Sequence, residues 1–319
     1  MRAVQVVRLD GPFAVEVREV AEPTRAPDQV LIDVRAAGVN FPDVLQSKGL
    51  YQYKPDPPFT LGSEMAGVVR EAPEGSSLRP GDRVAAFPGI GAFAEVVVAQ
   101  AEQVLPLPDE VSFAAGACLP MNYLTAHFAL LRRGHLQPGQ AVLVQGAAGG
   151  VGTACVQLAA ALGAQVIAVV SSDAKAEVAL AAGATHTVPV DGFRDAVTQL
   201  GGVDLVVDPV GGDRFTDSLR CLRPEGRLLV IGFTAGEIPT VKVNRLLLNN
   251  IDVVGVGMGA FAMVRPGFLG QLWDELVPHL RSGAVDPLIS ATFGLEQASE
   301  ALARIDDRRV TGKVVLETS

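Results

Sequence analysis

Cysteine is scarce in this sequence of 319 residues, which contains only three. Cys118, Cys155 and Cys221 lie far apart, and none has the close spacing of a redox motif or a metal-binding knuckle. This pattern excludes a disulfide scaffold and a cysteine-based zinc module. We expect free, buried thiols in a reducing compartment, and therefore a cytoplasmic protein.

Positive charge is also in short supply, since 26 Lys and Arg residues face 35 Asp and Glu residues, giving a formal net charge of -9. An acidic balance argues against a general binder of nucleic acid or of anionic membranes. Charged residues interrupt the first ten positions, so we expect no signal peptide. Glycine and glutamine break the long uncharged stretch 141–172, so we predict buried elements there. Neither nucleic acid nor membrane is expected as a partner.

Apolar residues, by contrast, make up 49% of the chain. A chain of this length and composition is expected to form two domains with cores of their own. The first 110 residues show short strands with glycine or proline at almost every junction, which is typical of a mainly β domain. The expected strands are 3–7, 13–20, 30–38, 65–71, 83–87 and 92–98.

The pattern changes near residue 112, where we expect a long alanine-rich helix that runs to about residue 133. Beyond it, nearly continuous apolar runs alternate with helical stretches, which predicts a doubly wound parallel sheet of the Rossmann type. The expected strands are 141–145, 165–169, 185–188, 204–207, 227–231 and 252–256. The expected helices between them are 151–162, 174–182, 191–200, 214–221 and 243–248.

The last segment predicts a helix at 268–282 and a strand at 312–316, which are too few to form a core of their own. We therefore expect this segment to fold back onto the first domain, so that the Rossmann domain is an insertion. The expected boundaries are 1–120 for the first domain, 121–264 for the Rossmann domain and 265–319 for the return segment.

A glycine-rich turn leads from the strand at 141–145 into a helix, which is the context that a dinucleotide-binding turn requires. Gly149 would let the backbone approach a pyrophosphate, Gly152 would let helix and strand pack closely, and the helix N-terminus supplies unpaired N–H groups. Ala147 stands where the fingerprint usually has its first glycine. An ordinary tight connection is the alternative. The candidate cofactor residues are Ala148, Gly149, Gly150, Val151 and Gly152.

The end of the second Rossmann strand indicates which nucleotide is preferred. A site for NAD usually has Asp or Glu there, which accepts hydrogen bonds from the ribose hydroxyls. This sequence instead has Ser171 and Ser172, followed by Lys175, and two hydroxyls with a cation suit the 2′-phosphate of NADPH. Arg194 and Arg308 are further candidates for the same phosphate. The alternative for Lys175 is a solvated helix residue.

Seven short motifs spread over the whole chain are together characteristic of one family. They are 37–43, 49–51, 61–67, 80–84, 147–152, 208–212 and 308–313. Through them the sequence resembles the zinc-free quinone oxidoreductases, the ζ-crystallin-like branch of the medium-chain dehydrogenase/reductase superfamily. The resemblance implies an α/β protein in which a GroES-like, mainly β catalytic domain surrounds an inserted Rossmann doubly wound parallel sheet.

The same resemblance bears on metal binding and on the substrate. Zinc-dependent relatives have Cys and His at the positions of Asn40 and Ser63, and catalytic zinc needs three Cys, His or carboxylate ligands, so we expect no metal. Without a Lewis acid, the substrate has to accept a hydride readily, as a quinone or another electron-poor carbonyl compound does. NADPH-dependent quinone reduction is therefore implied. The alternatives are an enone, enal or enoyl-thioester reductase, and an NADPH-binding protein with little turnover.

The family pattern also implies roles for single residues. Asn40 and Tyr51 are the catalytic candidates: Asn40 near the nicotinamide ribose, and Tyr51 in the substrate pocket as a proton donor or as an aromatic wall. Leu45 stands where many relatives have a second tyrosine, while Asp43 and Glu64 are expected to be structural. The edge of the sixth Rossmann strand is expected to pair in a homodimer. The other implied cofactor-binding residues are Thr125, Ile231, Phe233 and Arg308.

Overall fold

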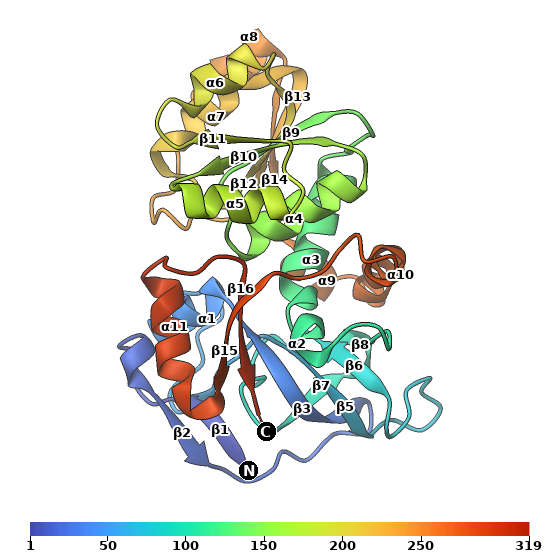
Figure 1. The fold of residues 1–319 in the computed structure, drawn as a ribbon. Helices are drawn as coiled ribbons and strands as arrows, with labels where there is room; N and C mark the ends of the chain where they lie inside the picture. Colours follow the sequence, from blue (N-terminus) through green and yellow to red (C-terminus); the bar gives the residue numbers. More distant parts are fainter. Residues whose placement is uncertain (319) are drawn as a thin grey trace. The chain divides into compact units, whose positions relative to one another are not determined.

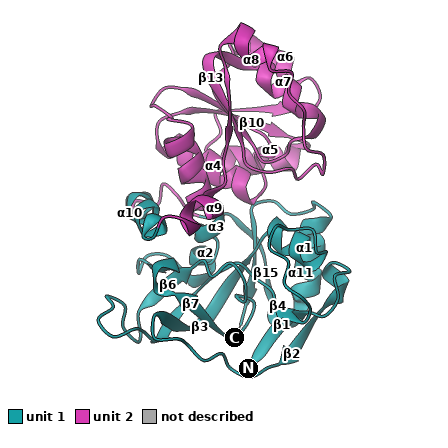
Figure 2. Ribbon diagram, turned by 180° about the vertical axis from the view of Figure 1, so that it is seen from behind, with its two compact units in different colours: residues 1–121, 266–281, 287–319 teal, residues 122–265, 282–286 magenta. Residues whose placement is uncertain are grey.

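The chain forms two compact units in a computed structural model that describes residues 1–318 (Figure 2). The N-terminal and C-terminal parts of the chain belong to one unit, and the middle of the chain forms the other. Unit 1 comprises Met1–Met121, Pro266–Arg281 and Pro287–Ser319, and unit 2 comprises Asn122–Arg265 and Ser282–Asp286.

Unit 1 is built on two sheets (Figure 1). Its strands are β1 Arg2–Val6, β2 Val15–Glu19, β3 Gln29–Val39, β4 Phe59–Thr60, β5 Glu64–Glu71, β6 Arg83–Ala86, β7 Val96–Gln100, β8 Val104–Pro106, β15 Ile289–Gly294 and β16 Lys313–Glu317. The smaller sheet has the order β2-β1-β4, and the larger has the order β15-β16-β3-β5-β6-β8, with β7 also paired to β3. The predicted GroES-like, mainly β half is confirmed.

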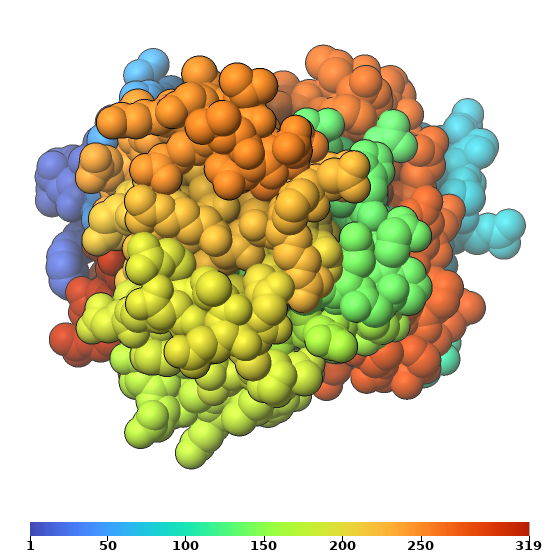
Figure 3. Space-filling view, turned by 90° about the horizontal axis from the view of Figure 1, so that it is seen from above, coloured from blue at the N-terminus to red at the C-terminus, as the bar shows by residue number. Residues whose placement is uncertain are grey.

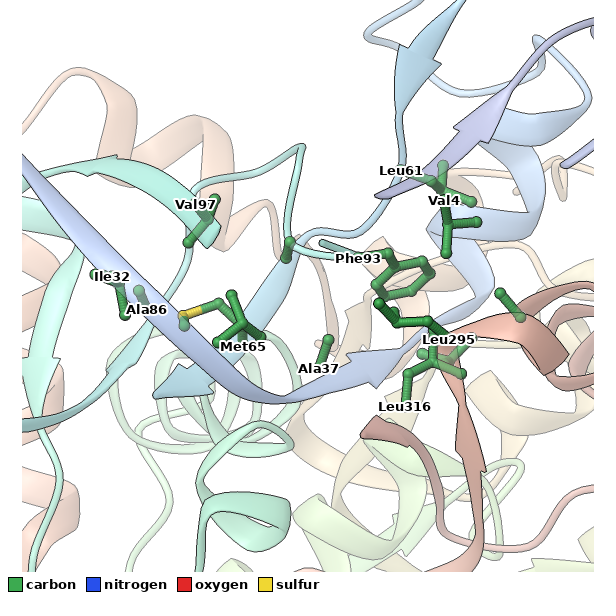
Figure 4. Close-up of a cluster of buried hydrophobic side chains, with 14 of the residues drawn as sticks. Val4, Ile32, Ala37, Leu61, Met65, Ala86, Phe93, Val97, Leu295 and Leu316 are labelled. Carbon is green, nitrogen blue, oxygen red and sulfur yellow. The ribbon is translucent and has the colours of Figure 1, made fainter. Parts of the chain in front are cut away.

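Strand β3 organises the core of unit 1, because most of its residues are buried and it pairs with β5, β7 and β16. Apolar side chains from these strands pack together, among them Ile32 of β3, Met65 of β5 and Leu316 of β16 (Figure 4). The C-terminal strand β16 lies antiparallel to β3, with Val314 opposite Val39. The end of the chain therefore joins the N-terminal sheet, as its lack of a separate core predicts.

Short helices and one longer helix complete unit 1. The α-helices are α1 Phe41–Ser47, α2 Phe113–Gly116, α10 Phe268–Arg281 and α11 Ala298–Asp306, and the 3-10 turns are η1 Pro12–Ala14, η2 Ala101–Gln103 and η5 Leu295–Gln297. Helix α10 buries Leu269, Leu272, Trp273 and Leu276, which recur at helical spacing along one face. The Trp273 indole N–H donates to the Pro106 carbonyl at 2.9 Å, which ties this helix to the end of β8.

Unit 2 contains the predicted six-stranded parallel sheet, with the order β11-β10-β9-β12-β13-β14. The strands are β9 Ala141–Val144, β10 Gln165–Val170, β11 His186–Pro189, β12 Val203–Asp208, β13 Leu222–Val230 and β14 Asp252–Gly255. The helices after the first strand are α4 Gly150–Ala161, α5 Asp173–Ala181, α6 Phe193–Gln199, η4 Gly212–Arg214, α7 Phe215–Arg220, α8 Asn244–Asn249 and α9 Met258–Met263. The direction in which successive strands are added to the sheet reverses between β9 and β12. In such sheets, ligands bind at this reversal, outside the carboxyl ends of the strands.

Several expected elements differ in the structure. The single helix predicted from about 112 to 133 is broken into α2, α3 Leu119–His127 and the π-helical segment η3 Phe128–Arg133. Pro120 has no N–H to donate inside a continuous helix but is tolerated in a first turn, so a new helix begins beside it. The strand predicted at 92–98 is confirmed only in its second half, because β7 runs from Val96 to Gln100. Ala94 makes only an isolated bridge with Ala3.

In unit 1, the helices α1 and α11, the strands β4, β8 and β15, and the three 3-10 turns were not expected. In the described part of the chain, residues 1–318, no helix has the length and apolar character needed to cross a bilayer. The uncharged stretch 141–172 forms β9, α4 and β10, so its apolar residues belong to the sheet of unit 2 and to the helix packed on it.

Candidate active site

The first part of the candidate site is a buried polar cluster at the end of β3. Asn40 follows β3 directly with an extended backbone and precedes the first turn of α1. Its backbone N–H donates to Asp43 Oδ2 at 2.7 Å, so a carboxylate of the first helical turn satisfies this donor. Pro42 favours a helix start at this point because its backbone is pre-set for the first turn. The local sequence therefore fixes the backbone of Asn40.

The side-chain amide of Asn40 is held by three partners. Nδ2 donates to Glu64 Oε1 at 2.8 Å and to the Gly38 carbonyl at 3.2 Å. Oδ1 accepts from Lys313 Nζ at 2.6 Å. Asn40 itself is only 5% exposed. The structure thus joins this predicted residue to Lys313, whose role sequence reasoning missed. Lys313 ends the family motif 308–313 and stands immediately before the apolar run of the last strand.

Glu64, at the start of β5, is the centre of this cluster. Oε1 also accepts from Lys313 Nζ at 2.8 Å, and Oε2 accepts from the Met121 backbone N–H at 2.7 Å. The side chains of Lys313 and Glu64 are 2% and 0% exposed. A Cβ at Gly38 would collide with the Ala117 carbonyl and lie 2.5 Å from Glu64 Oε1, so only glycine leaves room for the carboxylate. These contacts suit the structural role expected of Glu64.

A second carboxylate, Asp43, lies buried beside the cluster. Its Oδ1 accepts from Ser63 Oγ at 3.1 Å, so the serine at the position of the zinc-ligand histidine hydrogen-bonds to this acid. Burial raises the pKa of Asp43 to about 7, although its hydrogen bonds to Asn40 and Ser63 act in the opposite direction. Tyr51 is half-buried, and burial together with the charge of Asp43 raises the pKa of its hydroxyl. Tyr53, two residues on, is 59% exposed.

The second part of the candidate site is the glycine-rich turn of unit 2. Gly146 has a φ of +59°, so the left-handed position lies one residue before Ala147, which stands at the first fingerprint position. Gly149 precedes α4 with an ordinary extended backbone. A Cβ at Gly152 would collide with the Gly146 carbonyl and lie 2.8 Å from the Cα of Ala147. The first N–H groups of α4, from Gly150 onward, have no partner within the helix.

The third part is the polar group at the end of β10. Ser172 caps α5, and its hydroxyl accepts from the Lys175 backbone N–H at 3.4 Å. Lys175 Nζ donates to Ser171 Oγ at 3.1 Å. Ser171 and Ser172 are exposed, and Lys175 is half-buried. The structure therefore brings together the three residues that the sequence proposed for the 2′-phosphate.

The two arginine candidates for that phosphate are placed differently. Arg194 pairs with Asp195 at 2.7 Å and with Asp217 at 3.5 Å, so its guanidinium is engaged by carboxylates of α6 and α7. Arg308 belongs to unit 1, directly after α11, and has a φ of +58°.

The remaining predicted residues lie on α3 and at the carboxyl edge of the parallel sheet. Thr125 is half-buried on α3, and Ile231 and Phe233 follow β13 directly. The backbone N–H of Ile231 donates to the Asp208 carbonyl at 2.9 Å, which joins this segment to the loop after β12. Phe233 is 37% exposed, so its ring is not buried in the core. A Cβ at Gly211 would lie 3.0 Å from its ring, so the two loops are in close contact.

The donor types in the site bear on metal binding. Within residues 1–318, no group of three His, Cys, Asp or Glu side chains is arranged to hold a metal ion. Asn40 and Ser63 present an amide and a hydroxyl. The three cysteines are free, and burial raises the pKa of each thiol to about 12, so they stay protonated.

Comparisons with known proteins bear on both halves of the chain. Residues 26–109 match the model of the alcohol dehydrogenase GroES-like domain, and residues 150–274 match that of the zinc-binding dehydrogenases. The chain is 36% identical to quinone oxidoreductase-like protein 2 of Bos taurus over 99% of its own length and 92% of the relative.

Two solved structures are similar over the whole chain. A probable oxidoreductase of Mycobacterium abscessus is 44% identical with a TM-score of 0.92, and the match covers 100% of this chain and 99% of that one. The quinone oxidoreductase of Thermus thermophilus, solved alone and with NADPH, is 35% identical with a TM-score of 0.87, and the match covers 100% of both chains.

Proposed function

Because this chain belongs to the zinc-free quinone oxidoreductase branch of the medium-chain dehydrogenase/reductase superfamily, we propose that it transfers hydride from NADPH to a hydrophobic quinone without a metal. The chain is an oxidoreductase of that superfamily. The choice of NADPH and of a quinone is the proposal. The observation that carries it is the cluster of Ser171, Ser172 and Lys175, where two hydroxyls and an ammonium stand at the place of a ribose-binding acid.

The glycine-rich turn fits a dinucleotide. Packing of the turn against α4 requires Gly152, but it does not require Gly149, where a Cβ would meet its nearest neighbour at 3.4 Å. The small residue at Gly149 leaves room for a ligand outside the turn. In the proposal, the first N–H groups of α4 donate to the pyrophosphate, while Lys175 and Ser171 bind the 2′-phosphate. Thr125, Ile231 and Phe233 are proposed to contact the nicotinamide, and Arg308 the adenosine phosphate.

The residues of unit 1 orient the ligands and manage the proton. Bound NADPH supplies the hydride. Asn40 is proposed to accept a hydrogen bond from a ribose hydroxyl, and Tyr51 to lie against the acceptor. Because burial and the charge of Asp43 raise the pKa of Tyr51, its hydroxyl stays protonated at neutral pH. It can therefore donate a hydrogen bond to the oxygen that gains negative charge.

The test is anaerobic oxidation of NADPH and NADH with an ortho-quinone, a para-quinone, an enone and an enoyl-CoA as acceptors. Preferential turnover of a quinone with NADPH supports the proposal. Turnover of only the enone or the thioester assigns the chain to the corresponding reductases. Tight binding of NADPH without oxidation in the presence of any acceptor contradicts an enzymatic role.

We also propose a cytoplasmic homodimer that forms through the edge of the parallel sheet. In the described chain, β14 pairs only with β13. Helix α8, at the top of Figure 1, lies on the surface seen in Figure 3, and Leu247 and Leu248 are 76% and 74% exposed. An open strand edge is normally covered, and so are exposed apolar side chains such as those of the helix that precedes this strand in the sequence. The double variant Leu247→Asp/Leu248→Asp should elute as a monomer in size-exclusion chromatography with light scattering, whereas a wild-type monomer would contradict the proposal.

A further inference from the structure

The side-chain amide of Asn40 makes nearly all the hydrogen bonds it can make with partners inside unit 1. The two hydrogens of Nδ2 go to Glu64 Oε1 and to the Gly38 carbonyl, and Oδ1 accepts from Lys313 Nζ. A carbonyl oxygen can accept two hydrogen bonds. One acceptor position on Oδ1 is therefore the remaining hydrogen-bonding capacity of this side chain.

The charges on either side fix the orientation of that amide. A reversed amide would turn its NH₂ group toward the Lys313 ammonium and its oxygen toward the Glu64 carboxylate and the Gly38 carbonyl. Both contacts would then be repulsive, at atom separations of 2.6 to 3.2 Å. Because Lys313 and Glu64 are buried, water screens these interactions little. The oxygen of Asn40 therefore stays an acceptor.

Stability alone gives little reason for this buried ion pair. Removing two charges from water costs about as much as their attraction returns, so apolar side chains of similar size would serve a core equally well. The ion pair instead fixes the orientation of the Asn40 amide. Glu64 orients the Nδ2 end, Lys313 orients the Oδ1 end, and Oε2 of Glu64 is itself held by the Met121 N–H at 2.7 Å.

We propose that Lys313 and Glu64 are positioning residues that hold Asn40 as a hydrogen-bond acceptor for a hydroxyl group of the bound ligand. This inference rests on the proposed function. A quinone carbonyl has no hydrogen to donate, so this atom does not recognise the oxidised acceptor. Two sources of a hydroxyl remain: the nicotinamide ribose of the cofactor and the hydroxyl of the reduced product.

The test uses the double variant Lys313→Met/Glu64→Gln, which removes both charges at nearly constant size. The new amide at position 64 can donate to Asn40 as well as accept from it, so the two charges no longer fix the orientation of the Asn40 amide. Thermal unfolding verifies that the variant folds. The matched control is Lys48→Met/Asp306→Asn, which removes an ion pair of 2.7 Å in unit 1 outside the cluster.

Three dissociation constants are measured by direct binding: for NADPH, for adenosine 2′,5′-bisphosphate, which lacks the nicotinamide ribose, and for the hydroquinone. If the ribose is the donor, the double variant and Asn40→Ala should each weaken NADPH binding about tenfold and leave the bisphosphate unchanged. If the product is the donor, hydroquinone binding should weaken instead. The control should change none of the three constants.

Two results would overturn the proposal. One is a folded double variant that binds all three ligands like the wild type while Asn40→Ala does not, since Asn40 would then need no positioning. The other is an equal loss for NADPH and the bisphosphate, which would indicate a general structural effect. Because the binding measurements need no turnover, they remain decisive even if the wild type reduces no acceptor and the proposed function fails.

Discussion

Asn40, Glu64 and Lys313 lie buried in unit 1 within hydrogen bonds of 2.6 to 2.8 Å, whereas Ser171 and Lys175 lie near the surface of unit 2 and share one hydrogen bond of 3.1 Å. Both clusters are polar, and both contain a lysine. In the first, every partner is needed because a buried charge without a counterpart is costly. In the second, water can replace any partner, so the side chains are free to serve a ligand.

The contrast between the buried and the exposed cluster shows where in the molecule stability and ligand preference can be changed independently. A change in the buried cluster should alter the fold and the ligand site together. A change in the exposed cluster should alter only which nucleotide is preferred.

Lys313→Met should lower the free energy of unfolding by about 3 to 5 kcal/mol, because it leaves the Glu64 carboxylate buried without its cation. Lys175→Met, the matched change in the exposed cluster, should change it by less than about 0.5 kcal/mol. Urea denaturation of both variants measures the difference. Equal losses in the two variants would contradict the division between the clusters.

Of the two clusters, only the buried one has a neighbouring carboxyl, Asp43, that should make stability depend on pH. The pKa of Asp43 is raised to about 7 by burial, above that of an unfolded carboxyl, so the native state binds the proton more tightly. The free energy of unfolding should therefore fall as the pH rises from about 4 to about 7, by up to about 4 kcal/mol, and this contribution should be constant above that.

Asp43→Asn should remove this contribution, since its side chain does not ionise. Chemical denaturation of wild type and variant at pH 5 and pH 8 gives the comparison. The variant should lose less stability than the wild type between the two values. Parallel changes in both proteins would show that Asp43 is not the titrating group.

The secondary structure could be predicted best where burial leaves a strong pattern. All six strands of the parallel sheet lie within a few residues of their expected positions, except that β13 begins five residues early, because strands covered on both faces are nearly continuous apolar runs. Helix α11 was missed although its apolar residues recur at helical spacing, because it has only nine residues and buries only three of them, Ala298, Ala301 and Leu302. Strand β15 was missed because Phe293 is its one fully buried side chain.

The candidate site could also be predicted in part, where its residues are close together in the sequence. Ser171, Ser172 and Lys175 are neighbours in sequence, so a local pattern could predict their meeting. Lys313 and Asn40 are 273 residues apart and meet because β16 pairs with β3, and Glu64 joins them because β5 also pairs with β3. No local pattern contains this register, so the sequence indicated Asn40 and Glu64 separately but not the ion pair that joins them.

The two glycines of the dinucleotide turn provide a smaller test within unit 2. Gly152→Ala should cost about 1 to 3 kcal/mol, because the new Cβ would collide with the backbone of its own turn. Gly149→Ala should leave stability within about 0.5 kcal/mol of the wild type, since its nearest neighbour lies at 3.4 Å, but should weaken NADPH binding. Thermal unfolding and fluorescence titration measure the two effects. Unchanged NADPH affinity in Gly149→Ala would make this turn an ordinary connection.

The smallest expected effect is on the choice between nucleotides. Lys175→Met should lower the ratio of kcat/KM for NADPH to that for NADH about tenfold, because it removes the ammonium beside Ser171 that can pair with a 2′-phosphate. Lys242→Met is the control, since it removes an exposed lysine of the same unit and changes the net charge equally. A long-range effect of charge would lower the ratio in both variants. An unchanged ratio in Lys175→Met would leave this lysine as a solvated helix residue and would remove the main support for a preference for NADPH.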